Sequence, residues 1–347
     1  MVHVHIDDAL LGSPDALDAL DVGLKLLAGP KPRLFFRAPA RVRLDKQHGV
    51  PAALWQVDSL VGLQQHPLLE RAIAVAVDLR DGVVRVGSLR PEDYETPEPF
   101  PQEAGARPPP VGAAVNSRYF DLVEVCHVPR RVGDYLVSVV LLDQHSNREP
   151  VSVRASDLSD AFHDPAVDAL INAEYLRKGH PRVWPLPTAH TPSYAPRPDV
   201  PTPPDAAGIV MTAPRAVAQR PGTPWPLRGA WRLPLRPEDI VRTPDATVEH
   251  MERRGFGRPT AVVPVSLLFT GADSPRDVLV QLGLPTFDPI DVANPPGSVT
   301  GCFSLDLQQT FEGKLEPQTY FVYAFSREVM AGPTQTALVA AERLPER

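Results

Sequence analysis

The sequence predicts a mainly β protein made of two antiparallel sandwiches in tandem, with a few short helices and a proline-rich connection. The main observation is an internal repeat. Leu305-Asp306-Leu307 follows Phe120-Asp121-Leu122 by 185 positions, and Tyr320–Phe325 follows Tyr135–Val140 by the same interval. Apolar residues also alternate in short segments bounded by turn signals, as they do in β-strands. The 42 prolines among 347 residues oppose long helices and favour short elements with extended connections.

The repeat continues on both sides of these blocks when the interval changes slightly. Val263–Phe269 then matches Ile73–Leu79, and Pro333 matches Pro150. A chain of this length suits two domains, each on the order of 100–150 residues. We therefore expect an N-terminal strand and helix in residues 1–30, the first sandwich in 31–155, a helix and the proline-rich connection in 156–226, and the second sandwich in 227–347.

The N-terminal part begins with Val2–Ile6, which alternates like a short strand. Ser13-Pro14-Asp15 predicts a helix start, and Gly29-Pro30 predicts its end. Arg80-Asp81-Gly82 predicts a hairpin turn in the first sandwich. Its expected strands are residues 34–36, 41–44, 52–57, 73–79, 83–86, 119–125 and 135–142, with a helical insertion at 59–71 and a proline-rich loop at 91–110.

The connection between the sandwiches has two parts. Asp164-Pro165 predicts the start of a helix that ends at Gly179. Residues 181–226 are dense in proline and almost without periodicity, which is typical of an extended, semi-rigid spacer. The alternative is that this segment is held against a domain or a neighbouring subunit.

The second sandwich is expected to begin near residues 225–231, where Ala230–Pro234 loosely matches Leu34–Ala38. Thr243-Pro244-Asp245 predicts the cap of a short helix that Gly255 closes. Strands are expected at residues 262–269, 278–284, 301–307, 320–326 and 334–339. Short strands at regular spacing favour an antiparallel sandwich.

The segment Leu315–Ala324, with Tyr320 at its strand start, resembles the E-to-F corner of fibronectin type III and immunoglobulin-like domains. In those domains a tyrosine near the start of strand F turns its hydroxyl back to the upstream backbone. Val132–Val137, with Tyr135, resembles the same corner in the first copy. The resemblance implies two immunoglobulin-like or fibronectin-III-like sandwiches, an architecture that hosts many unrelated functions.

Charge and cysteine content exclude some classes of protein. A net charge of -7 gives no electrostatic footprint for a nucleic-acid backbone. Cys126 and Cys302 are the only cysteines and fall in different copies, so a disulfide-stapled secreted scaffold is not expected. The N-terminus has no secretion signal and no segment is long and apolar enough to span a membrane. We therefore expect a cytoplasmic protein.

No sequence motif predicts a catalytic, cofactor-binding or metal site. The glycine-rich nucleotide loops and the G-x-S-x-G elbow are absent. His3 and His5 would share one strand face and could bind a metal, but an exposed terminal strand is the simpler interpretation. His163 and His180 are 17 positions apart, too far along the chain for the spacing that aims two imidazoles at one ion.

Cys126-His127 places a thiol beside an imidazole in sequence. At a strand end, neighbouring side chains point to opposite faces. We therefore expect a buried cysteine and an exposed histidine rather than a reactive pair.

Aromatic residues on one strand suggest a stacking platform for a sugar or a base. Alternation divides them, because Tyr320 shares one face with Val322 and Ala324 while Phe321, Tyr323 and Phe325 share the other. If both faces are covered by protein, no ligand is needed to explain them.

These observations favour a non-catalytic structural or protein-interaction protein, a scaffold that binds another protein or its own copies. The first alternative is a metal-dependent enzyme, or an enzyme accessory subunit, with a site between the copies. The second is a carbohydrate-binding module that uses the aromatic residues.

Overall fold

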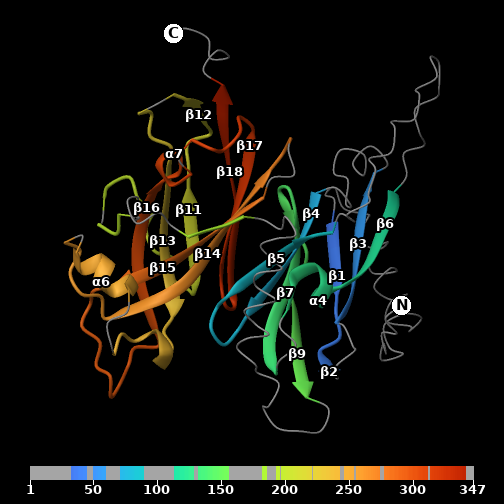
Figure 1. Cartoon of the computed structure of the whole chain (residues 1–347), viewed down its shortest axis with the longest axis horizontal. Coiled ribbons are helices and arrows are strands. Elements are labelled where there is room, and N and C mark those ends of the chain that lie inside the picture. The colour runs from blue at the N-terminus through green and yellow to red at the C-terminus, as the bar shows by residue number, and fades with distance from the viewer. Residues whose placement is uncertain are drawn as a thin grey trace. The chain divides into compact units, whose positions relative to one another are not determined.

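The computed structural model describes most of the two predicted sandwiches. The described residues are 33–44, 50–59, 71–89, 113–128, 132–155, 182–185, 193–195, 197–220, 222–242, 246–253, 255–273, 277–311 and 313–340. The chain divides into two compact units, residues 1–80 with 84–181 and residues 81–83 with 182–347 (Figure 1). Most described residues lie in strands, so the mainly β fold is confirmed.

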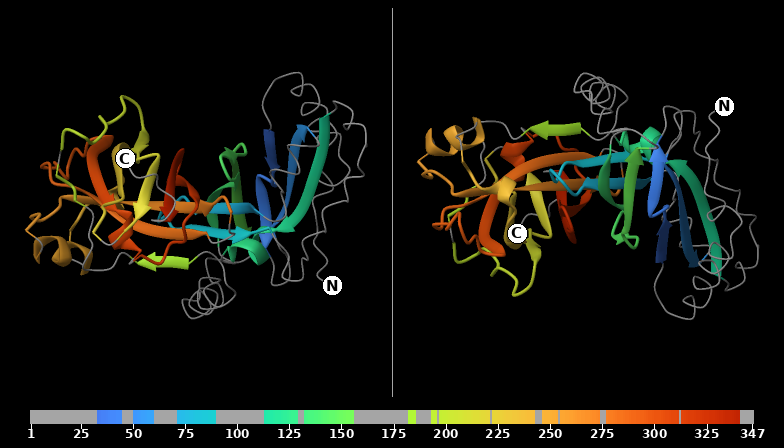
Figure 2. Two further views of the ribbon diagram at one scale, coloured as in Figure 1. Left: turned by 90° about the horizontal axis from the view of Figure 1, so that it is seen from above. Right: turned by 90° about the horizontal axis from the view of Figure 1, so that it is seen from below.

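The first unit is a sandwich of two sheets. The smaller sheet has the order β1 (Arg33–Arg37), β3 (Pro51–Ser59) and β6 (Ala113–Asp121), which lie side by side in Figure 2. The larger sheet has the order β2 (Arg41–Leu44), β9 (Glu149–Ala155), β7 (Gly133–Leu141), β4 (Ala72–Asp78) and β5 (Val84–Ser88), and β8 (Gln144–His145) pairs with β7. Only β2 and β9 pair in parallel. A short helix, α4 (Leu122–Cys126), follows β6.

The second unit is also a sandwich of two sheets. Its smaller sheet has the order β11 (Gly208–Thr212), β13 (Pro226–Pro234) and β16 (Ser298–Asp306). Its larger sheet has the order β12 (Ala216–Gln219), β18 (Val329–Ala340), β17 (Thr319–Ser326), β14 (Ala261–Gly271), β15 (Val278–Thr286) and β10 (Arg182–Pro185). β12 and β10 pair in parallel with their neighbours, and the other pairs are antiparallel. The described helices are η1 (Pro237–Asp239), α6 (Ala246–Arg253) and α7 (Leu307–Thr310).

Each unit has one hydrophobic core between its two sheets. In the first, alternate residues such as Leu54 of β3 and Val139 of β7 point inward. In the second, Trp231 of β13 and Val265 of β14 do the same. Burying a large apolar side chain contributes about 1.5–3 kcal/mol, so the alternation in the sequence is what holds the sheets together.

The two units share one strand plan. β1, β3 and β6 correspond to β11, β13 and β16, while β2, β9, β7, β4 and β5 correspond to β12, β18, β17, β14 and β15. A three-stranded sheet facing a larger sheet is the arrangement of immunoglobulin-like and fibronectin-III-like sandwiches. These strand orders agree with the predicted pair of sandwiches.

Two equivalent aspartates organise the corner after β6 and β16. In each, Oδ1 accepts two backbone N–H groups, one from the first turn of the following helix and one from the start of the neighbouring strand. The donors are Val123 and Val50 for Asp121, both at 2.8 Å, and Gln308 and Trp225 for Asp306, at 3.0 and 3.1 Å. Each carboxylate caps the helix and also accepts a hydrogen bond at the start of the neighbouring strand. This double role explains why the aspartate is the same in both copies.

The tyrosine corner is present in the second unit. Tyr320 is 1% exposed, and its hydroxyl donates to the carbonyl of Glu316 at 2.7 Å. It also accepts from Nε2 of Gln318 at 3.2 Å. Tyr135 occupies the equivalent position and is buried, but residue 131, four positions upstream of it, lies outside the described residues.

The structure corrects the alignment of one strand. Ile73 of β4 pairs with Val140, and Ser266 of β14 pairs with Phe325. Since Val140 and Phe325 are 185 positions apart, Ile73 corresponds to Ser266, and its expected match with Val263 is wrong. The error is three residues, an odd number, and therefore exchanges the two faces of the strand. Val263 lies in the core, whereas Ile73 points away from it.

The match between Pro150 and Pro333 is also wrong. Pro150 pairs with Leu136, and the residue paired at the equivalent place in the second unit is Gln335, opposite Phe321. Equivalent residues of β9 and β18 are therefore also 185 positions apart, and the interval between the copies does not change in these strands.

The second sandwich starts earlier than the expected boundary at residue 227. β11 pairs with β13, and β12 pairs with β18, so both strands belong to this sandwich. Ala230–Pro234 lies in β13, the counterpart of β3, and therefore does not match the β1 segment Leu34–Ala38. The prolines flank these short strands, and two proline carbonyls accept side-chain hydrogen bonds: Pro204 from Arg232 and Pro214 from Thr336. The described part of the proline-rich segment is thus held against the domain rather than acting as a spacer.

Local helix predictions had mixed outcomes. α6 agrees with the predicted helix, and Gly255 closes it with a φ of 79° and a hydrogen bond to the carbonyl of Glu252 at 3.0 Å. The strand expected at 119–125 is wrong in its second half, because residues 122–126 form α4 after the Asp121 cap. The elements expected at 2–29, in residues 60–70 of the 59–71 insertion, in the 91–110 loop and at 164–179 lie outside the described residues.

Candidate functional site

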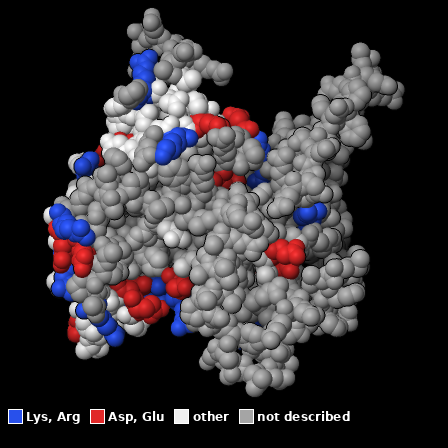
Figure 3. All heavy atoms as spheres, in the orientation of Figure 1, with Lys and Arg blue, Asp and Glu red and all other residues white. Residues whose placement is uncertain are grey.

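Where the face drawn in Figure 3 shows described residues, acidic and basic side chains lie close to one another. In the part of the chain that the structure describes, no helix has the length and apolar character needed to cross a membrane.

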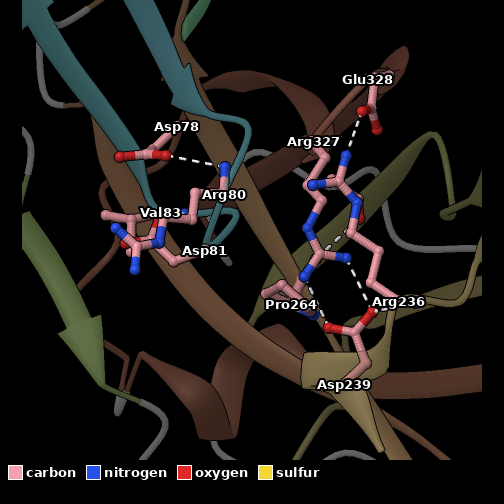
Figure 4. Close-up of polar contacts among 10 residues, drawn as sticks. Asp78, Arg80, Asp81, Val83, Arg236, Asp239, Pro264, Arg327 and Glu328 are labelled. Carbon is pink, nitrogen blue, oxygen red and sulfur yellow. Dashed lines mark hydrogen bonds and ion pairs between the residues drawn. The ribbon is translucent and has the colours of Figure 1, made fainter. Parts of the chain in front are cut away.

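A buried ion pair occupies one end of the second unit. The β17–β18 hairpin turns at Arg327-Glu328, and Arg327 has a left-handed φ of 44°. Its guanidinium donates to both carboxylate oxygens of Asp239, at 2.9 and 2.7 Å (Figure 4). The two side chains are only 4% and 3% exposed. The pair therefore joins the hairpin turn to η1 by a bidentate, charge-assisted contact.

Further contacts fix this junction. Oδ2 of Asp239 accepts from the backbone N–H of Arg236 at 3.0 Å, and the guanidinium of Arg236 pairs with Glu328. Burial lowers the pKa of Arg327, but its hydrogen bonds to Asp239 and the neighbouring negative charges outweigh this, and the net direction is upward. An ion pair this deeply buried adds little net stability over an apolar pair, because both charges lose their hydration. Its effect is to set the position of the turn.

An open groove of about 540 Å³ lies next to this pair. Its lining residues are Pro237, Glu238, Asp239, Ile240, Val241, Arg242, Val248 and Val262. The aliphatic side chains form the wall, while Glu238 and Arg242 are exposed at the rim. One acidic and one basic residue give the groove no preference for either charge.

Each larger sheet has a second apolar face, opposite the core, which we call the outer face. In the first unit it includes Ile73, Val75, Val77, Val84, Val86 and Val140, and in the second Leu268, Leu279, Tyr323 and Phe325. All these side chains are buried, although none belongs to a core cluster. No charged residue lies on the outer face over β4, β5 or β7 from Leu136 onward, nor over β14, β15 or β17. These sheets are therefore apolar on both faces, as expected for sheets that are buried on both faces rather than exposed to water on one.

The aromatic residues are placed as alternation predicts. Tyr320, Val322 and Ala324 lie in the core, and Tyr323 and Phe325 lie on the outer face with their ring centroids 6.4 Å apart. Tyr323 is 0% and Phe325 1% exposed, so this pair offers no open platform for a sugar ring.

One edge of the second unit's smaller sheet carries an added residue from the proline-rich segment. Ser193 and Ser304 of β16 exchange two backbone hydrogen bonds, both of 2.8 Å. Tyr194 is 8% exposed and anchors the segment by donating its hydroxyl proton to the carbonyl of Gly283 at 3.0 Å. Burial raises the pKa of this hydroxyl, so it stays protonated as a donor.

The prediction for Cys126 is confirmed, and the prediction for His127 is wrong. Cys126 is fully buried at the end of α4, and burial raises the pKa of its thiol, so the expected inert cysteine is confirmed. The exposed His127 was wrong: it is 8% exposed and caps α4 with a φ of 47°, because the segment is helical rather than a strand end. Cys126 and Cys302 are free thiols.

The remaining histidines are not brought together by the described structure. His3, His5, His163 and His180 lie outside the described residues. Among the residues that are described, no group of three or more histidine, cysteine, aspartate or glutamate side chains could hold a metal ion.

Sequence reasoning missed the Arg327–Asp239 pair. Its members are 88 positions apart and neither belongs to a repeated block. Leu142, the counterpart of Arg327, has a φ of 54° in the equivalent turn, so the backbone repeats while the side chain does not. The arginine in the turn was the only signal of this ion pair in the sequence, and its partner could be identified only from the fold.

The chain resembles known proteins in structure but not in sequence. The chain matches no protein-family model and no curated protein sequence. Among solved structures it is similar to the chicken interferon gamma receptor alpha chain, with 10% identity over 89% of this chain and 97% of that chain and a TM-score of 0.16. It is also similar to the FN1–FN3 domains of chicken CNTN1, with 8% identity over 90% of this chain and 69% of that chain and a TM-score of 0.16. The fold assignment above rests on the strand order, not on these matches.

Proposed function

We propose that this chain is a non-catalytic structural or protein-interaction protein whose two sandwiches make contacts with protein surfaces. The repeated strand plan is the observation that supports it most. Two sandwiches of one plan present two similar sets of sheet edges and turns, and a partner with two sites binds such a pair more tightly than either sandwich alone. The outer faces of the larger sheets are already buried within the chain, so they are not the contact surface in this proposal.

The partner in this proposal is another protein or a second copy of the chain. The net charge of -7 supports a protein partner over a nucleic acid. A cytoplasmic location remains a prediction from the sequence, to be tested by fractionating cells that express the tagged chain.

Size-exclusion chromatography with light scattering and a pull-down, both with the full-length chain, test the proposal. We expect either an oligomer or a captured protein partner. A strict monomer that captures nothing would contradict the proposal. Stoichiometric zinc, copper or iron in elemental analysis would instead favour a metal-dependent enzyme.

A further inference from the structure

The connection between β15 and β16, residues 287–297, presents apolar side chains to solvent. Val292 is 59% exposed and Phe287 37% exposed, and both are among the exposed large hydrophobic residues of the described structure. Ile290, between them, is partly buried against the core of the second unit and attaches the loop to it. A single exposed apolar side chain needs no explanation, but two on one attached loop give a protein partner two side chains to bury.

Hydrogen bonds hold this loop at its start, its middle and its end. The hydroxyl of Thr260 donates to the carbonyl of Asp288 at 2.6 Å, and the backbone N–H of Leu235 donates to the carbonyl of Gly297 at 3.3 Å. Between them, the carboxylate of Asp291 accepts the backbone N–H of the residue two positions further on, at 2.9 Å. A loop that is already ordered loses less conformational entropy when it binds.

The groove beside η1 lies next to this loop. The carbonyl of Thr260 accepts the backbone N–H of Val241 at 3.0 Å, so the residue that holds the start of the loop also holds one wall of the groove. Figure 1 shows the loop at the same end of the second unit as α6, which contributes Val248 to the groove. The volume of about 540 Å³ is within the range of pockets that enclose a ligand, so the groove has room for apolar side chains.

The charged residues of the loop and of the groove differ. The loop carries Asp288 and Asp291 and no basic residue. At the rim of the groove, the negative charge of Glu238 raises the pKa of Arg327, so this carboxylate is partly balanced by the buried ion pair. Arg242, in contrast, is exposed and forms no ion pair or hydrogen bond with another described residue. A copy of the loop in this groove would bring a carboxylate to Arg242.

We propose that the chain forms a two-fold symmetric dimer in which the loop of residues 287–297 of each copy lies in the groove beside η1 of the other. Phe287 and Val292 bury their side chains against the aliphatic wall, and Asp288 pairs with Arg242. Because the loop and the groove belong to one surface, a two-fold axis forms both contacts at once, which favours a second copy over a different protein. This inference rests on the proposed function and names its partner.

Light scattering after size-exclusion chromatography of the full-length chain, over a series of concentrations, tests the inference. We expect a dimer, and we expect Val292→Asp to raise its dissociation constant about tenfold or more because a carboxylate then has to enter an apolar groove. Val210→Asp is the matched control, since Val210 is 39% exposed and lies on β11, outside both the loop and the groove. It should stay within about twofold of wild type.

A charge exchange between copies tests the pairing of Asp288 with Arg242. Asp288→Arg and Arg242→Asp each bring like charges together in both contacts of a dimer, so each variant alone should dimerise about tenfold more weakly than wild type. In an equimolar mixture of the two variants, both contacts of a mixed dimer join opposite charges. The mixture should therefore dimerise to within about threefold of wild type, a recovery that a structural role of either residue inside one copy would not produce.

Three results would overturn the inference. The first is a chain that stays monomeric up to about 1 mM. The second is a dimer that Val292→Asp leaves unchanged, and the third is a mixture of the two charge variants that dimerises no better than either alone. If the chain is monomeric but captures another protein in the pull-down, only this inference falls and the proposed function remains.

Discussion

Replacing Tyr320 by phenylalanine tests the corner that the resemblance predicts. The change removes one hydroxyl from a side chain that is 1% exposed. Two hydrogen bonds disappear, one to the Glu316 carbonyl and one from Gln318. Each contributes roughly 0.5–1.5 kcal/mol, so the expected loss is about 1–2 kcal/mol. For a unit of this size the melting temperature should fall by about 3–6 °C.

The assay has to report on the second unit alone, because a chain of two units need not unfold in one step. The ring of Trp225 lies 5.8 Å from that of Tyr320, so the ¹⁹F signal of 5-fluorotryptophan at Trp225 is a local probe for urea denaturation. Tyr194→Phe is the matched control, since it removes a single hydrogen bond, to Gly283, and should cost about half as much. A Tyr320→Phe variant with the wild-type midpoint would refute the corner. The sequence predicts about 1 kcal/mol for Tyr135→Phe as well.

Three further predictions concern other polar contacts. Arg327→Met should cost about 3–5 kcal/mol in urea denaturation because it leaves the Asp239 carboxylate buried without its cation, and the added change Asp239→Leu should recover most of the loss. Asp306→Ala should cost about 1–2 kcal/mol through the lost helix cap, and Asp306→Asn distinctly less, by thermal denaturation. The hydrogen bond from Ser152 and the Arg154 contact lower the pKa of Asp134 below its ordinary 3.8, so its stabilising contribution is present above that pH and is lost as the pH falls through the lower folded value. NMR titration should show this pKa rising in Ser152→Ala.

The sequence predicted those elements whose signals are local. Strand alternation identified β4, β7, β14 and β17, and a closing glycine identified the end of α6. It did not identify β11 and β12, because four- and five-residue strands between prolines carry too few alternating positions to be distinguished from an extended spacer. The pairing of β12 also depends on β18, which lies far along the chain, whereas β11 pairs with the nearby β13.

The alignment error between β4 and β14 has a physical cause. Both faces of these strands are apolar, so the sequence gives no polar face against which to set the register. In a half-exposed strand a shift of three residues would have buried polar side chains and would have been rejected. The second apolar face is therefore the reason why the correct interval could not be found from the sequence.

The two copies have the same residue where only one type of side chain is suitable, and they differ where several types are suitable. A carboxylate at Asp121 and Asp306 satisfies two backbone donors, and a shorter or apolar side chain would leave them unsatisfied. The core allows alternatives: Gly301 leaves room for the ring of Trp231, and the first copy has Asn116 and Gln56 at these two places. Cores tolerate such exchanges when the total volume is kept, whereas corners do not. The conserved pairs in this chain therefore reflect the duplicated fold, and any divergence of binding roles between the copies must be sought at edges and turns such as β16 and Arg327, where they differ.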